Sequence, residues 1–156
     1  SLRRRMFVTV IPPNCGIGNS LNYVVPEQTN QQKRYLAAVM QSWVFEYRAR
    51  QISTNSHINM YVVRQIPVPR IDESSPLFGD IISRVDEILN TESTDRPREE
   101  ILNEIDALVA LAYGLSKAEL EHVLSRFEKL EDDTIEEILT NYRMFTSTPD
   151  EVTAND

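Results

Sequence analysis

A run of polar and basic side chains between residues 48 and 59 has the chemistry needed to read base edges in DNA. In the major groove, arginine pairs with guanine, and asparagine or glutamine pairs with adenine, each through two hydrogen bonds. Hydroxyl and imidazole groups add further donors and acceptors. The candidate base contacts are Arg48, Arg50, Gln51, Ser53, Thr54, Asn55, Ser56, His57 and Asn59.

A second set of basic residues suits the sugar-phosphate backbone, where contacts position a duplex without reading its sequence. These candidate phosphate contacts are Arg3, Arg4, Arg5, Lys33 and Arg34. The base-contact candidates also have ordinary structural roles open to them. Asn55 and Ser56 suit the cap of a turn, His57 suits an interior position with its hydrogen bonds satisfied, and Asn59 suits the edge of a strand.

The charge of the chain is divided unevenly along its length. The whole chain carries a formal net charge of -8. Residues 1–70 hold nine basic and two acidic residues, a net charge of +7, whereas residues 71–156 hold seven basic and twenty-two acidic residues, a net charge of -15. A polyanion would therefore be attracted to the first half and repelled by the second. Lopsided surface charge also occurs without any function, so the division alone does not identify a partner.

The elements expected to position these side chains are a helix, a loop and a strand. Apolar residues at helical spacing predict one amphipathic helix that starts at Tyr35 and stops before a polar loop at residues 51–57. A β-branched and aromatic run at residues 58–66 then predicts a strand, which Pro67 and Pro69 end. The helical stripe consists of Leu36, Val39, Met40, Trp43 and Tyr47.

Two further short strands are expected at residues 6–11 and 21–25, each closed by proline. Beyond residue 70, apolar stripes at helical spacing predict four helices, with a packed bundle as their simplest role. The predicted fold class is therefore α+β, a small β-sheet with a packed helix followed by a mostly helical C-terminal segment. The helix signals include Pro97 in a first turn, Gly114 as a C-cap, Ser116 with Glu119 as a capping box, and a helix over 133–142.

Three short motifs suggest other chemistry but lack the required context. Gly16 and Gly18 form a G-x-G that no helix and no acidic partner follow, so a plain turn or an approach of the backbone to DNA explains them better than a cofactor. Pro12, Pro13 and Asn14 stand in the wrong order for the N-P-P-Y motif of adenine methylation. The third motif is an acidic run, which resembles a nuclease magnesium site without its strand and lysine: Glu131, Asp132, Asp133, Glu136 and Glu137.

A structural metal and a membrane anchor are not expected. Cys15 is the single cysteine, and the chain has only two histidines, so no multi-cysteine zinc site can form. No apolar run reaches the ~18 residues of a membrane span, and the N-terminus has no apolar signal-peptide core. We therefore expect no metal, no membrane and a cytoplasmic location.

The helix and the run that follows it resemble a known family. LAAVMQSWVFEYRARQ and then HINMYVVRQIPVP are similar to the end of the target-recognition domain in Type IIG restriction-modification enzymes and related adenine-specific DNA methyltransferases. Upstream, RRRMFVTVIPPNCGIGNSLNYVV resembles the strand, loop and strand that precede that helix in the family. Downstream, EILNEIDALVALAYGLSKAELEHVL resembles its helical C-terminal segment. Together these matches cover most of residues 3–128.

The resemblance implies that this chain is a C-terminal fragment of a longer bacterial enzyme. That parent enzyme would transfer a methyl group from S-adenosylmethionine to adenine N6, with or without linked DNA cleavage, and its catalytic motif and cofactor loop would lie upstream. The fragment itself would hold no catalytic residue and no cofactor. Its expected parts are the end of a DNA target-recognition domain at 1–70, a helical segment at 71–145 and a flexible tail at 146–156.

The expected partners are double-stranded DNA, the upstream methyltransferase domain of the parent chain and, through an exposed sheet edge, further copies of this chain. The competing class is a protein-interaction module in which the helices dock a partner without DNA. The layout of helices after a recognition domain resembles Type I specificity subunits, where such helices act as spacer and docking surface. A nuclease is the third and most distant alternative.

Overall fold

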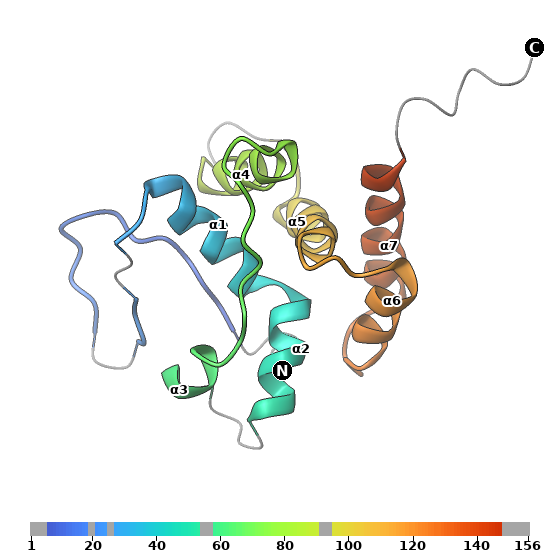
Figure 1. Cartoon of the computed structure of the whole chain (residues 1–156), viewed down its shortest axis with the longest axis horizontal. Helices are drawn as coiled ribbons and strands as arrows, with labels where there is room; N and C mark the ends of the chain where they lie inside the picture. Colours follow the sequence, from blue (N-terminus) through green and yellow to red (C-terminus); the bar gives the residue numbers. More distant parts are fainter. Residues whose placement is uncertain (1–5, 19–20, 25–26, 54–57, 91–94, 148–156) are drawn as a thin grey trace, which may run out of the picture.

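A computed structural model describes residues 6–18, 21–24, 27–53, 58–90 and 95–147. These residues form a bundle of helices joined by short loops, preceded by an extended loop that projects from the body of the molecule (Figure 1). The helices are α1 Asn30–Gln41, α2 Trp43–Ile52, α3 Met60–Val63, α4 Pro76–Leu89, α5 Arg98–Ala112, α6 Lys117–Ser125 and α7 Asp132–Thr146.

The predicted α+β fold class is wrong, because no strand occurs among the described residues and every regular element there is a helix. At residues 6–11, Met6 is buried in the core and the Val8 N–H donates to Gln41 Oε1 at 2.8 Å, so this extended segment rests on α1 instead of pairing with a strand. Residues 21–24 are exposed and irregular. An extended segment without a neighbouring ladder has no partners for its backbone groups and cannot form a sheet.

The run at residues 58–66 contains a short helix, α3, where a strand was expected. Asn59 decides this locally, because its side-chain oxygen accepts from the Val62 N–H at 3.1 Å and caps the helix. The neighbours Val62 and Val63 both pack on the same core cluster. In a strand, successive side chains would point to opposite faces, so this contact pattern is that of a helix.

The helix predicted from Tyr35 to about residue 50 is two helices that meet at Ser42. Ser42 has an extended backbone, with φ -71° and ψ 154°, and serves both as the C-cap of α1 and as the N-cap of α2. Its hydroxyl donates to the Val39 carbonyl at 2.6 Å and accepts from the Phe45 N–H at 3.2 Å. The break sends the two ends of the predicted stripe into different clusters, with Val39 in one and Trp43 in the other.

The four helices expected beyond residue 70 are confirmed as α4 to α7. Pro97 was expected in the first turn of a helix but is the N-cap of α5, whereas the signals at Gly114 and Ser116 act as predicted. Gly114 has a left-handed φ of +71° and follows α5, so glycine is needed there. Ser116 and Glu119 form the reciprocal capping box of α6. The Ser116 N–H donates to the Glu119 carboxylate, which lowers the pKa of that carboxyl.

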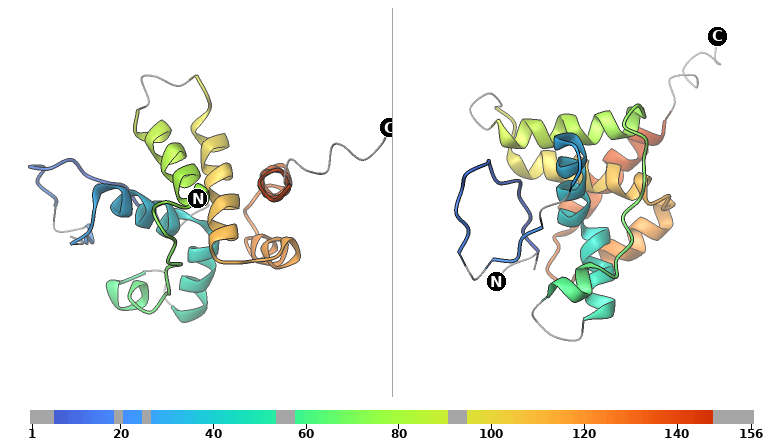
Figure 2. Two further views of the ribbon diagram at one scale, coloured as in Figure 1. Left: turned by 45° about the horizontal axis from the view of Figure 1, so that its top comes forward. Right: turned by 60° about the vertical axis from the view of Figure 1, so that its left-hand side comes forward.

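The centre of the bundle is α5, which packs against α4 on one side and α7 on the other (Figures 1 and 2). One core cluster joins α1, α2, α4 and α5, and a second joins α2, α5, α6 and α7. Among the described helices, only α2 and α5 supply buried residues to both clusters. Each cluster therefore contains residues from both halves of the chain.

A buried polar contact fastens α2 to α5. Asp106, which is 2% exposed, lies in the middle of α5 and accepts from the Trp43 N–H at 2.8 Å. Trp43 is the first residue of α2, where backbone N–H groups have no partner within the helix and the helix dipole favours a negative charge. The carboxylate thus fixes the start of α2 against the central helix.

We expect Asp106→Ala to lower the free energy of unfolding by about 1–3 kcal/mol, because it leaves the buried Trp43 N–H without its acceptor. Asp106→Asn keeps an acceptor oxygen at this position and should lose less. Urea unfolding of both variants and of the original chain measures the difference. Equal loss in the two variants would show that the hydrogen bond does not set the stability of this junction.

Candidate nucleic-acid interface

The second half of α2 presents two of the candidate base contacts to solvent. Arg48 and Gln51 are exposed and lie three residues apart, so they are neighbours on one helix face. The Arg48 Nη1 group donates to Gln51 Oε1 at 2.9 Å. This contact orients the two side chains together and leaves the Gln51 amide NH₂ as a donor. A guanidinium and an amide held side by side are the groups that read guanine and adenine.

Arg50 lies on the same helix, but its side chain is held against the protein by contacts with other residues. Its Nε and Nη2 donate to Oε1 of Glu46 at 3.0 and 2.5 Å, and Glu46 is only 1% exposed. Its guanidinium also covers the Phe127 ring, 4.5 Å from the ring centre. The side chain of Arg50 is 28% exposed. Its main role is therefore to neutralise a buried carboxylate, and a base contact would have to compete with that role.

The remaining base-contact candidates divide into cap residues and residues outside the described part. Ser53 is the C-cap of α2, and Asn59 is the N-cap of α3. The other four candidates lie outside the described residues: Thr54, Asn55, Ser56 and His57.

Among the phosphate candidates, the structure describes only Lys33 and Arg34. The Arg34 Nη1 group lies 2.6 Å from Oδ1 of Asp86, which ties α1 to α4 by a half-exposed ion pair. Lys33 is half-buried and makes no ion pair with a described residue. Arg3, Arg4 and Arg5 lie outside the described residues. Packing against the acidic helices therefore reduces the positive charge available from the first half of the chain.

Sequence reasoning missed three other exposed arginines of this region. Arg64 directly follows α3, and Arg70 lies in the middle of the segment that connects α3 to α4; neither forms an ion pair with a described residue. Arg126 follows α6 and lines an open pocket with Tyr47, Arg50, Gln51 and Phe127. The charges of Arg64 and Arg70 were visible in the sequence. No sequence signal places Arg126 beside α2, because only the packing of α6 on α2 brings it there.

Two tyrosines, the buried Tyr35 and the half-buried Tyr113, hold the connecting segment in place. The Tyr35 hydroxyl donates to the Pro69 carbonyl at 2.8 Å, and the Tyr113 hydroxyl donates to the Pro67 carbonyl at 2.8 Å. Burial raises the pKa of Tyr35 to about 12. It also raises the pKa of Tyr113, with a smaller contribution from the nearby Tyr35. The segment crosses in front of α1 on its way to α4 (Figure 1), so these bonds fix the region between Arg64 and Arg70.

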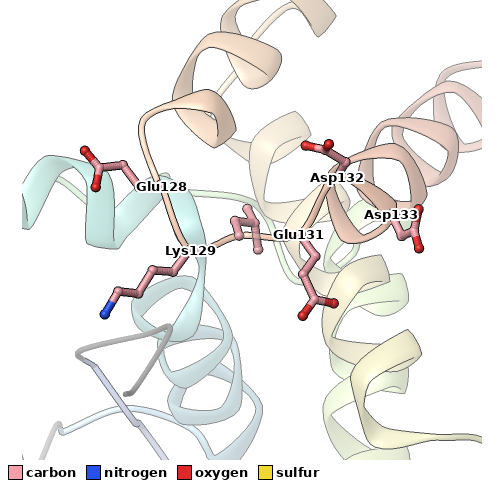
Figure 3. Close-up of a pocket in the computed structure, with 6 residues that line it drawn as sticks. Glu128, Lys129, Glu131, Asp132 and Asp133 are labelled. Carbon is pink, nitrogen blue, oxygen red and sulfur yellow. The ribbon is translucent and has the colours of Figure 1, made fainter.

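The acidic run does not form a metal site in the described part of the chain. A shallow pocket is lined by residues 128–133, between α6 and α7. The carboxylates of Glu128, Glu131, Asp132 and Asp133 point in different directions and do not converge (Figure 3). Within the described residues, no group of three or more histidine, cysteine, aspartate or glutamate side chains is placed to hold a metal ion.

Gly16 and Gly18 lie in an exposed part of the N-terminal loop. Space is open around the position of a Cβ atom at both Gly16 and Gly18, and neither has a left-handed φ. The next helix, α1, begins only at Asn30, so no helix N-terminus follows the loop directly. This geometry is that of an exposed connecting loop.

Comparisons with models of protein families, with curated proteins and with solved structures find no match to this chain. In the parts of the chain that the structure describes, no helix has the length and apolar character required to cross a bilayer.

We expect Arg50→Ala to destabilise the fold by about 3 kcal/mol, because it removes the arginine that pairs with the buried Glu46 carboxylate. Glu46→Gln/Arg50→Ala also removes the buried negative charge and should recover part of the loss. Urea unfolding measures both, with Arg48→Ala as the exposed control expected to stay within about 0.5 kcal/mol. A loss of that small size for Arg50→Ala would contradict the buried ion pair.

We expect the folded chain to lose stability at high pH because of the buried Tyr35 phenol. Its pKa rises from 10.0 to about 12 on folding, so the folded state holds the proton more tightly. The stabilisation is complete below pH 10 and is lost as the pH rises towards 12. We expect the stability difference between the original chain and Tyr35→Phe to shrink over this range in urea unfolding. A stability difference that stays constant between pH 10 and pH 12 would contradict this prediction.

Proposed function

We propose that this chain is a non-catalytic DNA-binding part of an adenine-N6 DNA methyltransferase from a restriction-modification system. The observation that carries the proposal is the exposed pair of Arg48 and Gln51 on α2, held together by their hydrogen bond. Helices that present arginine and amide side chains in this way are suited to the major groove. The family resemblance of residues 3–128 supplies the reaction of the parent enzyme.

The distribution of ion pairs leaves several cations of the first half of the chain available for DNA. Arg34 forms an ion pair with Asp86, and Arg50 forms one with Glu46. In the first half of the chain, the described cations that form no ion pair with a described residue are Lys33, Arg48, Arg64 and Arg70. Their charge is available to replace the counterions around DNA phosphates. We assign base reading to Arg48 and Gln51 and backbone contact to Lys33, Arg64 and Arg70.

The parent enzyme would supply the rest of the chemistry. An upstream methyltransferase domain would bind S-adenosylmethionine and the target adenine, in the cytoplasm of a bacterium. This chain would then orient the duplex and would bind no cofactor itself. The surface of α2 and the adjoining loop would thus set which sequence reaches the catalytic domain.

A second candidate function is protein interaction, favoured by the apolar surface of the N-terminal loop. Phe7, Leu21 and Tyr23 are 66%, 61% and 64% exposed, and this loop extends away from the helices (Figure 2). Exposed aromatic and aliphatic side chains gathered on one segment are typical of surfaces that another protein covers. The upstream domain of the parent chain or a second copy of this chain would be the occupant.

We expect the chain to bind a random-sequence DNA duplex at low salt, with an affinity that falls linearly with salt on a log-log plot. Arg48→Ala should reduce the slope of that plot by about 1, because one fewer counterion is released. Fluorescence anisotropy across a salt series measures the slope. Arg143→Ala removes one positive charge from an exposed position of α7 and should leave the slope of the plot unchanged.

Absence of binding at low salt from a folded sample would reject the DNA-binding function. Sedimentation of the chain alone and with the upstream domain then tests the second candidate. Replacement of Phe7 and Tyr23 by serine should abolish association if the N-terminal loop is the contact surface.

A further inference from the structure

The open pocket between the ends of α2 and α6 brings together residues from the two halves of the chain. Tyr47, Arg50 and Gln51 come from α2, whereas Arg126 and Phe127 directly follow α6. The packing of α6 on α2 includes the Tyr47 and His122 rings, which meet edge to face with their centres 6.4 Å apart. An arginine of the acidic half therefore lies next to the polar face proposed for DNA.

We propose that this pocket binds a phosphate group of the DNA backbone, so that the helical segment contributes directly to the nucleic-acid surface. The proposal rests on the DNA-binding function proposed above. It adds Arg126 as a contact and gives the helices beyond residue 70 a part in binding as well as in packing.

The polar groups of the pocket are hydrogen-bond donors. Arg126 forms no ion pair with a described residue, so its guanidinium is available to a ligand. Arg50 uses Nε and Nη2 for Glu46, which leaves Nη1. Gln51 accepts from Arg48 through Oε1, which leaves its amide NH₂. A phosphate offers only acceptor oxygens and is the group that such a set of donors matches.

Part of the pocket is rigid before any ligand binds. Arg50 is held between the buried Glu46 carboxylate and the Phe127 ring, so little side-chain freedom remains to be lost on binding. Glu46 also offsets the charge of Arg50. The net positive charge of the pocket therefore comes from Arg126, which makes Arg126 the residue to test.

The two arginines have an alternative role that needs no ligand. Arg50 lies in the last turn of α2 and Arg126 is the C-cap of α6, and the carbonyl ends of helices favour cations. If this were their entire role, the arginine side chains would respond to salt in general and not to phosphate in particular.

The first test is a titration of the ¹⁵N-labelled chain with inorganic phosphate. The NMR signals of the arginine Nε–Hε groups report binding. We expect saturable shifts at Arg126 and Arg50 that sodium chloride at equal ionic strength does not produce, with no shift at Arg143. Arg126→Ala should remove the shift at Arg50. Equal shifts at all arginines, or no shift at Arg126, would overturn the proposal that this pocket binds phosphate.

The second test is the duplex salt series with Arg126→Ala and Arg126→Lys beside Arg48→Ala. Arg126→Ala should lower the slope by about 1, and Arg126→Lys should restore the slope while binding more weakly at every salt concentration. Because Arg126 is exposed and has no partner among the described residues, its variants should unfold at the same urea concentration as the original chain.

The two tests separate the two proposals. If Arg48→Ala lowers the slope and Arg126→Ala does not, DNA binding stands and the backbone contact at the pocket is wrong. A saturable phosphate shift combined with that result would mean that the pocket takes a free phosphate compound and not DNA. If the original chain binds no duplex, DNA binding fails, and this inference fails with it.

Discussion

The hydrogen bond from the Trp43 N–H to the buried Asp106 carboxylate fixes where α2 begins and how it is rotated against the central helix. Helix α2 can supply both core clusters only in that orientation, with Phe45 directed to one and Trp43 to the other. Its remaining face then carries Arg48 and Gln51 into solvent. The exposure of Arg48 and Gln51, which we propose to contact DNA bases, is thus a consequence of how the core packs around α2.

The same packing decides which positive charges remain available. Arg34 and Arg50 were indistinguishable from Arg48 by residue type, yet Asp86 and Glu46 engage the first two and not the third. Conversely, Arg126 lies in the acidic half of the chain but borders the polar face of α2. Net charge along a sequence therefore gives a poor account of charge at a surface when helices from both halves pack in the same clusters.

The sequence predicts the helices beyond residue 70 well because their signals are local. A glycine after α5 and a serine with glutamate three residues later fix ends that need no tertiary contact. Residues 58–66 could not be assigned in this way, since β-branched residues suit both a strand and a helix turn, and the Asn59 cap decided between them. The strands expected at the N-terminus had no partner strand among the described residues.

The candidate site was predictable in part. Arg48 and Gln51 were found from residue type, but Gln51 was expected in the loop after the helix. The structure places both on one face because α2 continues to Ile52. The pairing of Glu46 with Arg50 also had a signal, because oppositely charged residues four apart on a helix attract each other. Arg126 had none, since its position beside α2 depends on contacts between helices far apart in the sequence.

The most direct measurement of the central claim is a map of backbone amide shifts in the ¹⁵N-labelled chain on addition of a random-sequence duplex at low salt. We expect the shifts to concentrate at residues 48–52 of α2, near Arg64 and at residues 126–127, with α7 unaffected. Shifts confined to the N-terminal loop or to α7, or no shifts at all, would contradict it.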